Sequence, residues 1–175
     1  MTIMTETTPG SAVDMSRVER VRADFLNPLK MRGFFLAKLP LALFAGLRVR
    51  SLTADRCEVS VPRGWRTTNP FKSTYFAAQS MAAELSTGAL AMLATQGTRE
   101  SVALLITDLR ATFEKKASAD AVFTCDDGPK AFAAVAETLR TGEGVVAEME
   151  TVGRMADGTV VSRFVFTWSF KKRSS

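Results

Sequence analysis

The stretch that decides the fold is TYFAAQSMAAELSTGALAMLAT, which runs from Thr74 to Thr95. It contains no lysine or arginine, its one carboxylate is Glu84, and most of its turns carry alanine or another small residue. The pattern predicts one long helix. Helices on a protein surface present a charged face to water, and this segment has no such face. We therefore expect the helix to be enclosed on nearly every side.

The segments around this helix alternate apolar and polar residues, as half-buried strands do. Two short alternating runs, 47–52 and 57–61, are joined by a polar turn and predict a β-hairpin before the helix. After the helix, the sequence predicts four more strands, at 102–113, 121–125, 145–154 and 159–171. It also predicts one short inserted helix at 129–139. An antiparallel sheet curled around the long helix is the arrangement that best encloses it.

The chain before the hairpin is predicted to be a leader followed by short helices. Residues 1–13 are polar, contain Pro and Gly, and are expected to be disordered. From Asp14 onward, apolar residues recur at helical intervals, and Pro28, Gly33 and Pro40 are expected to divide the region into short pieces. Residues 14–175 are then a single α+β domain, with about six strands wrapped around the long helix.

Composition excludes several kinds of active site. The chain has 175 residues, of which 46% are hydrophobic and 23% charged, as is ordinary for one soluble domain. It has no histidine, so neither a Ser-His-Asp triad nor a histidine-ligated metal site can form. Cys57 and Cys125 match no zinc or redox spacing. We expect them to be buried, reduced thiols in a cytoplasmic protein that has no metal or other cofactor.

The charge and hydropathy of the chain indicate whether it binds nucleic acid or crosses a membrane. The net charge of +5 favours an anionic partner, but the basic residues are scattered, apart from the run 171–173. Nucleic-acid binders concentrate such charge, so we expect no nucleic-acid partner. The most apolar stretch, 31–47, is interrupted by Lys38 and Pro40 and is shorter than the about 20 residues of a membrane span. We expect no membrane span. An interfacial segment, or a lid over an apolar pocket, stays open as an alternative for this stretch.

The order of elements and the junction of loop and helix resemble the hotdog-fold acyl-CoA thioesterases of the phenylacetate-pathway and 4-hydroxybenzoyl-CoA branches. In those proteins, an asparagine precedes a His-Gly-Gly turn by six residues, and an acidic residue follows the histidine nine positions later. Asn69, Tyr75 and Glu84 stand at those spacings here. The stretch 106–117 resembles the family's third strand, and the likeness covers residues 47–171. The inserted helix makes the chain more similar to a branch known mainly as a domain of unknown function.

The resemblance implies a hotdog homodimer or tetramer that takes acyl-CoA or another acyl thioester. His-Gly-Gly is replaced by Tyr75, Phe76 and Ala77. The family polarises the thioester carbonyl with a backbone N–H of this turn, a role that falls to Phe76 here, and a backbone donor at a helix start needs no particular side chain. Loss of the glycines places side chains where an acyl group approaches. Thioester hydrolysis and non-catalytic binding of acyl groups or acyl-CoA both stay open.

Glu84 is the first candidate for catalysis, as a general base or a nucleophile. Its thioester substrate would be held by the turn of the neighbouring subunit. Desolvation among alanines should raise the pKa of this carboxyl group, which suits acid–base work. In the alternative, Glu84 is a structural residue whose carboxylate is satisfied by Ser80, by Thr87 or by a backbone N–H across the dimer interface.

The remaining candidates each carry two interpretations. Tyr75 could donate its hydroxyl to a carbonyl or to Glu84, or it could simply pack at the helix start. Asn69 could contact the substrate or serve as a turn residue before a proline. Thr87 could orient a water molecule or bond to its own backbone. Lys115, Lys116 and Arg110 could meet the phosphates of coenzyme A or lie solvated at a strand end.

Overall fold

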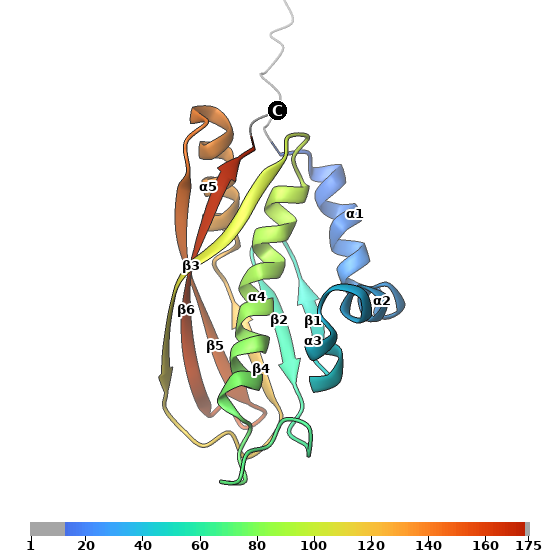
Figure 1. Ribbon diagram of the computed structural model, residues 1–175, viewed down its shortest axis with the longest axis vertical. Helices are drawn as coiled ribbons and strands as arrows, with labels where there is room; N and C mark the ends of the chain where they lie inside the picture. Colours follow the sequence, from blue (N-terminus) through green and yellow to red (C-terminus); the bar gives the residue numbers. More distant parts are fainter. Residues whose placement is uncertain (1–12, 174–175) are drawn as a thin grey trace, which may run out of the picture.

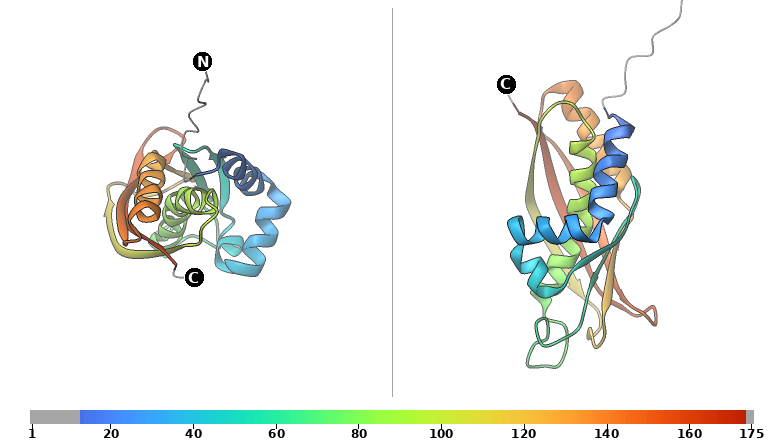
Figure 2. Two further views of the ribbon diagram at one scale, coloured as in Figure 1. Left: turned by 90° about the horizontal axis from the view of Figure 1, so that it is seen from above. Right: turned by 90° about the vertical axis from the view of Figure 1, so that its right-hand side faces the viewer.

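The structure is a computed structural model that describes residues 13–173, in which one curved antiparallel sheet holds a long helix on its concave face (Figures 1 and 2). Apart from Val13, the predicted leader lies outside the described residues. The elements are α1 (Met15–Leu26), α2 (Pro28–Lys38), α3 (Pro40–Ala45), β1 (Arg48–Leu52), β2 (Cys57–Val61), α4 (Phe76–Gln96), β3 (Val102–Phe113), β4 (Ala121–Cys125), α5 (Gly128–Thr141), β5 (Val145–Met155) and β6 (Val160–Lys172). The prediction of an α+β fold with six strands around a central helix is confirmed.

The sheet has the order β1-β2-β4-β5-β6-β3, and every neighbouring pair is antiparallel. β1 and β3 are therefore its edges. β3 is 12 residues long and pairs on one side with β6, while no described strand pairs with its other side. A long unpaired edge presents a row of free backbone donors and acceptors, to which another strand can add.

Helix α4 occupies the centre of the molecule, with α1 and α5 on its two flanks (Figure 2). Most of its 21 residues are buried, and most of these are small. The sheet opposite presents the buried aromatic side chains Phe164, Phe166, Trp168 and Phe170 from β6. Small side chains on the helix let these large rings approach closely. The core is therefore formed by small side chains of α4 packed against large aromatic side chains of β6. The predicted enclosure of the helix is confirmed.

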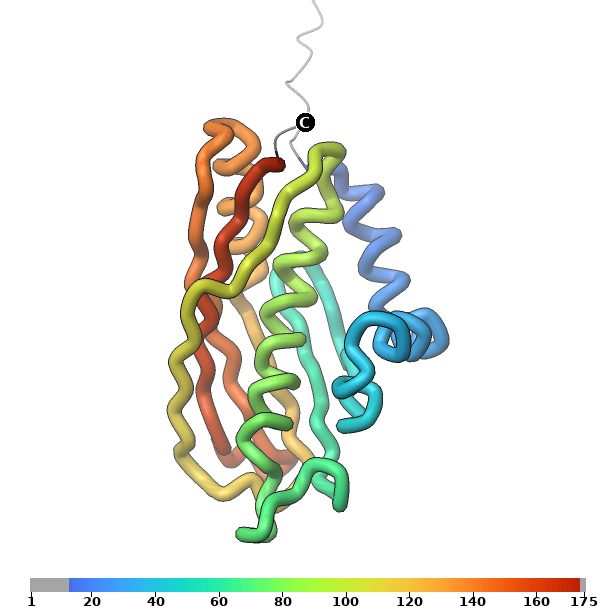
Figure 3. Tube along the Cα trace, viewed as in Figure 1, coloured from blue at the N-terminus to red at the C-terminus, as the bar shows by residue number. Residues whose placement is uncertain are grey.

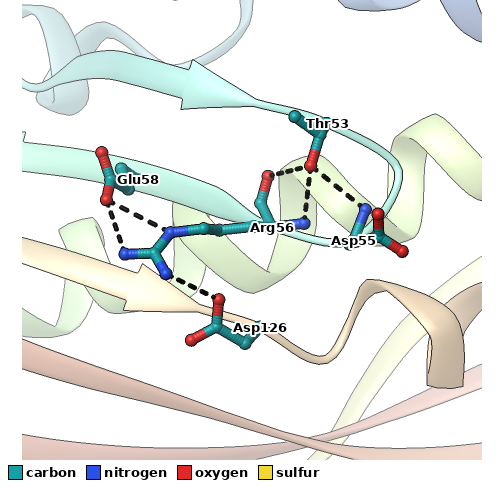
Figure 4. Close-up of polar contacts among 5 residues, drawn as sticks. All are labelled: Thr53, Asp55, Arg56, Glu58 and Asp126. Carbon is teal, nitrogen blue, oxygen red and sulfur yellow. Dashed lines mark hydrogen bonds and ion pairs between the residues drawn. The ribbon is translucent and has the colours of Figure 1, made fainter.

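The turn between β1 and β2 is fixed by polar contacts (Figure 4). Thr53 Oγ1 accepts hydrogen bonds from the backbone N–H groups of Asp55 at 3.2 Å and Arg56 at 3.0 Å. The Arg56 guanidinium then forms ion pairs with Glu58 at 2.8 Å and with Asp126, beyond the end of β4, at 3.1 Å. Exposed ion pairs add little stability, so these contacts mainly set where the turn lies relative to β4.

The segment before β1 shows what the prolines and the glycine do. Pro28 and Pro40 are the first residues of α2 and α3, a position where the missing N–H of proline costs nothing. Gly33 was predicted to break this region, and that prediction is wrong because Gly33 lies inside α2. An isolated glycine costs about 1 kcal/mol relative to alanine, which packing of the buried face of α2 offsets. None of the helices in residues 13–173 is long and apolar enough to cross a membrane.

The two cysteines lie directly opposite each other on β2 and β4, and both are buried and free. Burial raises the pKa of both thiols, that of Cys125 to about 12. Thiols with pKa values this high stay protonated at neutral pH and make poor nucleophiles. Cys57 and Cys125 therefore belong to the core.

Candidate functional site

The first part of the candidate site is the N-terminal end of α4, which follows the long loop after β2 (Figure 3). Tyr75 is the N-cap residue and Phe76 the first helical residue, and no side chain caps the helix. Within residues 13–173, the backbone N–H of Phe76 has no hydrogen-bond acceptor. The first N–H groups of a helix have no partner inside it and, with the helix dipole, favour an electron-rich oxygen. This end of α4 can polarise a carbonyl.

A pocket of about 610 Å³ opens at this helix end. It brings together five residues predicted from the sequence, Asn69, Tyr75, Phe76, Lys115 and Lys116, with one that was not, Phe113 at the end of β3. The rings of Phe76 and Phe113 meet edge to face with centroids 6.5 Å apart, and their side chains are 54% and 50% exposed. The pocket thus joins free backbone donors to an exposed aromatic wall, as small-molecule sites do.

Asn69 and Tyr75 have different surroundings in this pocket. Asn69 Oδ1 accepts hydrogen bonds from the backbone N–H groups of Phe71 at 3.0 Å and Ser73 at 3.2 Å, so it fixes the loop. These contacts are those of the turn residue that the sequence offered as an alternative. The ring of Tyr75 packs against that of Phe76, with centroids 4.8 Å apart, and its hydroxyl has no hydrogen bond to any described residue. That hydroxyl is free to contact a ligand.

Glu84 lies about 12 Å further along α4 than Phe76, because each residue adds about 1.5 Å to a helix. It is partly buried, and its carboxylate forms no hydrogen bond or ion pair within the described part of the chain. Burial raises the pKa of the Glu84 carboxyl group above its ordinary value of 4.5. The two hydroxyls offered as its partners bond to backbone instead, Ser80 to the Phe76 carbonyl at 2.9 Å and Thr87 to that of Glu84 at 3.0 Å.

Gly88 lies close to both the Glu84 carboxylate and the indole of Trp168. A Cβ atom at Gly88 would lie 3.0 Å from Glu84 Oε1 and 3.3 Å from the indole of Trp168, so the carboxylate lies over a glycine beside the ring. Trp168 Nε1–H donates to Thr87 Oγ1 at 3.0 Å, which fixes the indole. Thr87 is fully buried, and its hydroxyl both donates and accepts in this network. Thr87 therefore holds the Trp168 indole in place.

Sequence reasoning missed Phe113 and the placement of the Trp168 indole against Gly88. The spacing of Gly88, four residues after Glu84, puts it one turn along the same helix face and is a usable signal. Phe113 is the last residue of β3, the element that follows α4, and Trp168 lies on the last strand, β6, and no local pattern places either of them beside α4. Among the described residues, no group of three or more Cys, Asp or Glu side chains is placed to hold a metal ion.

The sequence matches a family model described as "Domain of unknown function (DUF4442)" over residues 30–170. The chain belongs to this family. No curated protein matches the sequence of this DUF4442 chain. The predicted similarity to a branch known mainly as a domain of unknown function is therefore confirmed by the family model, which covers every element from α2 to β6 in part or whole.

Solved structures similar to the DUF4442 chain come from several bacteria. A protein of unknown function from Pseudomonas aeruginosa, named a probable thioesterase, is 18% identical with a TM-score of 0.69, over 84% of this chain and 97% of that one. A protein of unknown function from Chlorobaculum tepidum is 14% identical with a TM-score of 0.71, over 93% and 99%. A thioesterase from Haemophilus influenzae is 12% identical with a TM-score of 0.61, over 83% and 91%. Identities this low show the fold alone, which is the predicted hotdog fold of thioesterase-like proteins.

Proposed function

We propose that this DUF4442 protein hydrolyses acyl thioesters, with coenzyme A thioesters as the substrate class, in a site that two copies of the chain share. One observation carries the proposal. Glu84, a partly buried carboxylate with no partner among the described residues, lies on the helix whose N-terminal end presents a free N–H to a pocket. The fold, shared with proteins named as thioesterases, supports it.

A second copy is needed because one chain does not bring the two groups together. Phe76 and Glu84 are about 12 Å apart along one helix and differ by about 80° around it. Pairing of β3 with the β3 strand of a second copy continues the sheet, and the exposed apolar residues Leu109 and Phe113 lie on the concave face of that edge. Two antiparallel copies of α4 then face each other, so that Glu84 of one subunit lies near the α4 start of the other.

The proposed reaction uses two groups of this site. Glu84 takes a proton from a water molecule, whose oxygen attacks the thioester carbonyl carbon. The Phe76 N–H donates a hydrogen bond to the oxyanion that forms. The intermediate collapses as the C–S bond breaks, and the proton on Glu84 passes to the leaving thiolate, which yields a carboxylic acid and a thiol. The raised pKa of Glu84 makes it a stronger base than an exposed glutamate.

The coenzyme A moiety suits the rim of the pocket. Lys115 and Lys116 are exposed there and form no ion pair with any described residue. Their neighbour Glu114 is engaged with Arg163 at 2.7 Å and does not neutralise them. Two free ammonium groups beside an apolar wall are suited to a substrate with phosphates at one end and an acyl group at the other.

A second candidate function is acyl-CoA binding without chemistry. The observation that favours it is the side chain of Phe76, which replaces a glycine of the related turn and is 54% exposed at the pocket wall. A ring there narrows the approach of an acyl group to the backbone. In this case acyl-CoA binds, and no thiol is released.

The test is hydrolysis of a panel of acyl-CoA substrates, from acetyl to palmitoyl and including phenylacetyl and benzoyl. Hydrolysis is measured as the rate at which free thiol is released. We expect turnover by the wild type and a loss of about 10²–10⁴-fold in Glu84→Gln, the range for removal of a general base. Equal turnover of the two proteins would overturn the role of Glu84. Binding of acyl-CoA with no thiol release across the panel would establish the second candidate function instead.

A further inference from the structure

A second pocket is lined by residues of helices α1 to α3, of the edge strand β1 and of the loop after β2. These helices and β1 lie on the side of the molecule away from the other edge strand, β3 (Figures 1 and 2). Its volume is about 830 Å³, within the range of roughly 300–1,000 Å³ that small-molecule sites occupy. No residue of α4 lines it, so it is separate from the site proposed above. Its apolar lining comes from Phe25, Met31, Phe35, Leu43, Leu47 and Val49.

Four arginines line the same pocket, and no acidic residue within 13–173 does. They are Arg32 from α2, Arg48 and Arg50 from β1, and Arg66 from the loop after β2. Arg50 Nε donates to Ser60 Oγ at 2.8 Å, and none of the four forms an ion pair with a carboxylate in residues 13–173. Elsewhere in the described chain some arginines, such as Arg56 and Arg163, do form such pairs and others do not, so what sets these four apart is that they line one pocket.

Three of the four arginines lie where the pocket adjoins a smaller cavity. Arg48, Arg50 and Arg66 also line an adjoining cavity of about 210 Å³. The one carboxylate of that smaller cavity, Asp120, accepts the backbone N–H of Arg63 at 2.7 Å. The pocket therefore has an apolar body and a cationic end, and none of the described carboxylates lines the pocket itself. Guanidinium groups match carboxylate and phosphate oxygens in pairs of parallel hydrogen bonds.

We propose that this pocket binds a single-chain amphiphilic anion. The aliphatic chain lies against the apolar lining between α1 to α3 and β1, and the carboxylate or phosphate head lies against Arg48, Arg50 and Arg66. The proposal does not depend on the proposed thioester hydrolysis, because the two sites share no residue. A pocket with arginines at one end favours binding of a single enclosed molecule. Attachment to a membrane needs only a charged surface and no such pocket.

The test is calorimetric titration of the full-length protein with four probes below their micelle concentrations. Dodecanoate and dodecyl phosphate carry the two candidate heads, and dodecanol and dodecyltrimethylammonium are the neutral and cationic controls. We expect at least one anion to bind about tenfold or more tightly than either control, because charge-assisted hydrogen bonds hold its head. The ratio of the two anions tells which head the arginines prefer.

Variants locate the bound probe. Arg48→Gln with Arg66→Gln should weaken anion binding by roughly tenfold or more. Arg99→Gln with Arg173→Gln changes the net charge equally outside the pocket and should leave binding unchanged, as should Glu84→Gln. The proposal is overturned if the Arg48 and Arg66 variant binds as tightly as wild type, if binding is lost in Glu84→Gln, or if only phosphatidylglycerol vesicles are bound. Circular dichroism of each variant checks that the fold is intact.

Discussion

The carboxylate of Glu84 lies over Gly88 and beside the indole of Trp168, and burial raises its pKa above 4.5. The folded chain therefore holds this proton at pH values where the unfolded chain has released it. The stability that results is fully present below about pH 4.5 and is lost as the pH rises through the raised pKa. In catalysis the sign is opposite: kcat/KM should fall as the pH drops below the raised pKa, because the base must be ionised.

Glu84→Gln removes the ionisable group, so we expect this variant to be more stable than wild type at neutral pH and equal to it at about pH 4. Urea unfolding across this pH range measures the difference. A variant that is less stable than wild type at neutral pH would contradict the account, because it would mean that a partner holds the charged carboxylate in the folded protein.

Phe76 is proposed to act through its backbone, and proline can remove that N–H. Proline is tolerated at the first position of a helix, and Tyr75, with φ −60° and ψ 138°, already has the conformation required of a residue before proline. We expect Phe76→Pro to lose about 10²–10³-fold in kcat, as for loss of one oxyanion donor. Phe76→Ala keeps the N–H and is the matched control. Equal turnover of the two variants would show that this N–H is not used.

Sequence reasoning reached some of these residues and not others. Glu84 is evident because it is the one carboxylate in a long run of small, uncharged residues, and Asn69 and Tyr75 follow from their spacing. The pocket partner Phe113 and the Trp168 indole depend on how β3 and β6 curl past α4, which no local pattern contains. The contacts of Thr87 likewise depend on an indole 81 residues away.

At the scale of elements, Gly128 shows how closely the start of α5 approaches the β1–β2 turn. Its N–H donates to the Asp55 carbonyl at 3.0 Å, and a Cβ atom there would lie 2.0 Å from the Ala54 carbonyl oxygen. The Cβ atom and the carbonyl oxygen are both bonded directly to backbone atoms, so rotation of a side chain cannot relieve the clash. We expect Gly128→Ala to lower the free energy of unfolding by about 1–3 kcal/mol.

Urea unfolding checks this value against Gly144→Ala. A Cβ atom at Gly144 meets nothing within 4 Å, and its φ is not positive. That substitution should change the free energy of unfolding by no more than about 0.5 kcal/mol. Equal stability of the two variants would mean that α5 or the β1–β2 turn can shift enough to accommodate a Cβ atom at Gly128.

Most elements could be predicted from the sequence, whereas their arrangement could not be predicted in detail. Alternation identifies β3 as a strand, but it does not say that β3 pairs with the last strand rather than with β4, the next along the chain. That choice depends on burial of the β6 aromatics under α4. Gly33 was misjudged because a local rule for glycine was outweighed by packing along α2.

At the scale of the whole molecule, the two edges of the sheet differ. The β1 edge lies beside α1 to α3 and an arginine-lined pocket, whereas the β3 edge carries exposed Leu109 and Phe113 on its concave face. An apolar, unpaired edge suits a second copy of the same chain, related by a twofold axis. The central claim is that each active site takes Glu84 from one subunit and the Phe76 N–H from the other.

A heterodimer of Glu84→Gln and Phe76→Pro subunits, purified through two different affinity tags, tests this claim most directly. One of its two sites combines both intact groups and the other combines both defects. We expect the heterodimer to hydrolyse the preferred acyl-CoA at about half the wild-type rate, although each variant alone is nearly inactive. A heterodimer no more active than the two parent homodimers would contradict a shared site.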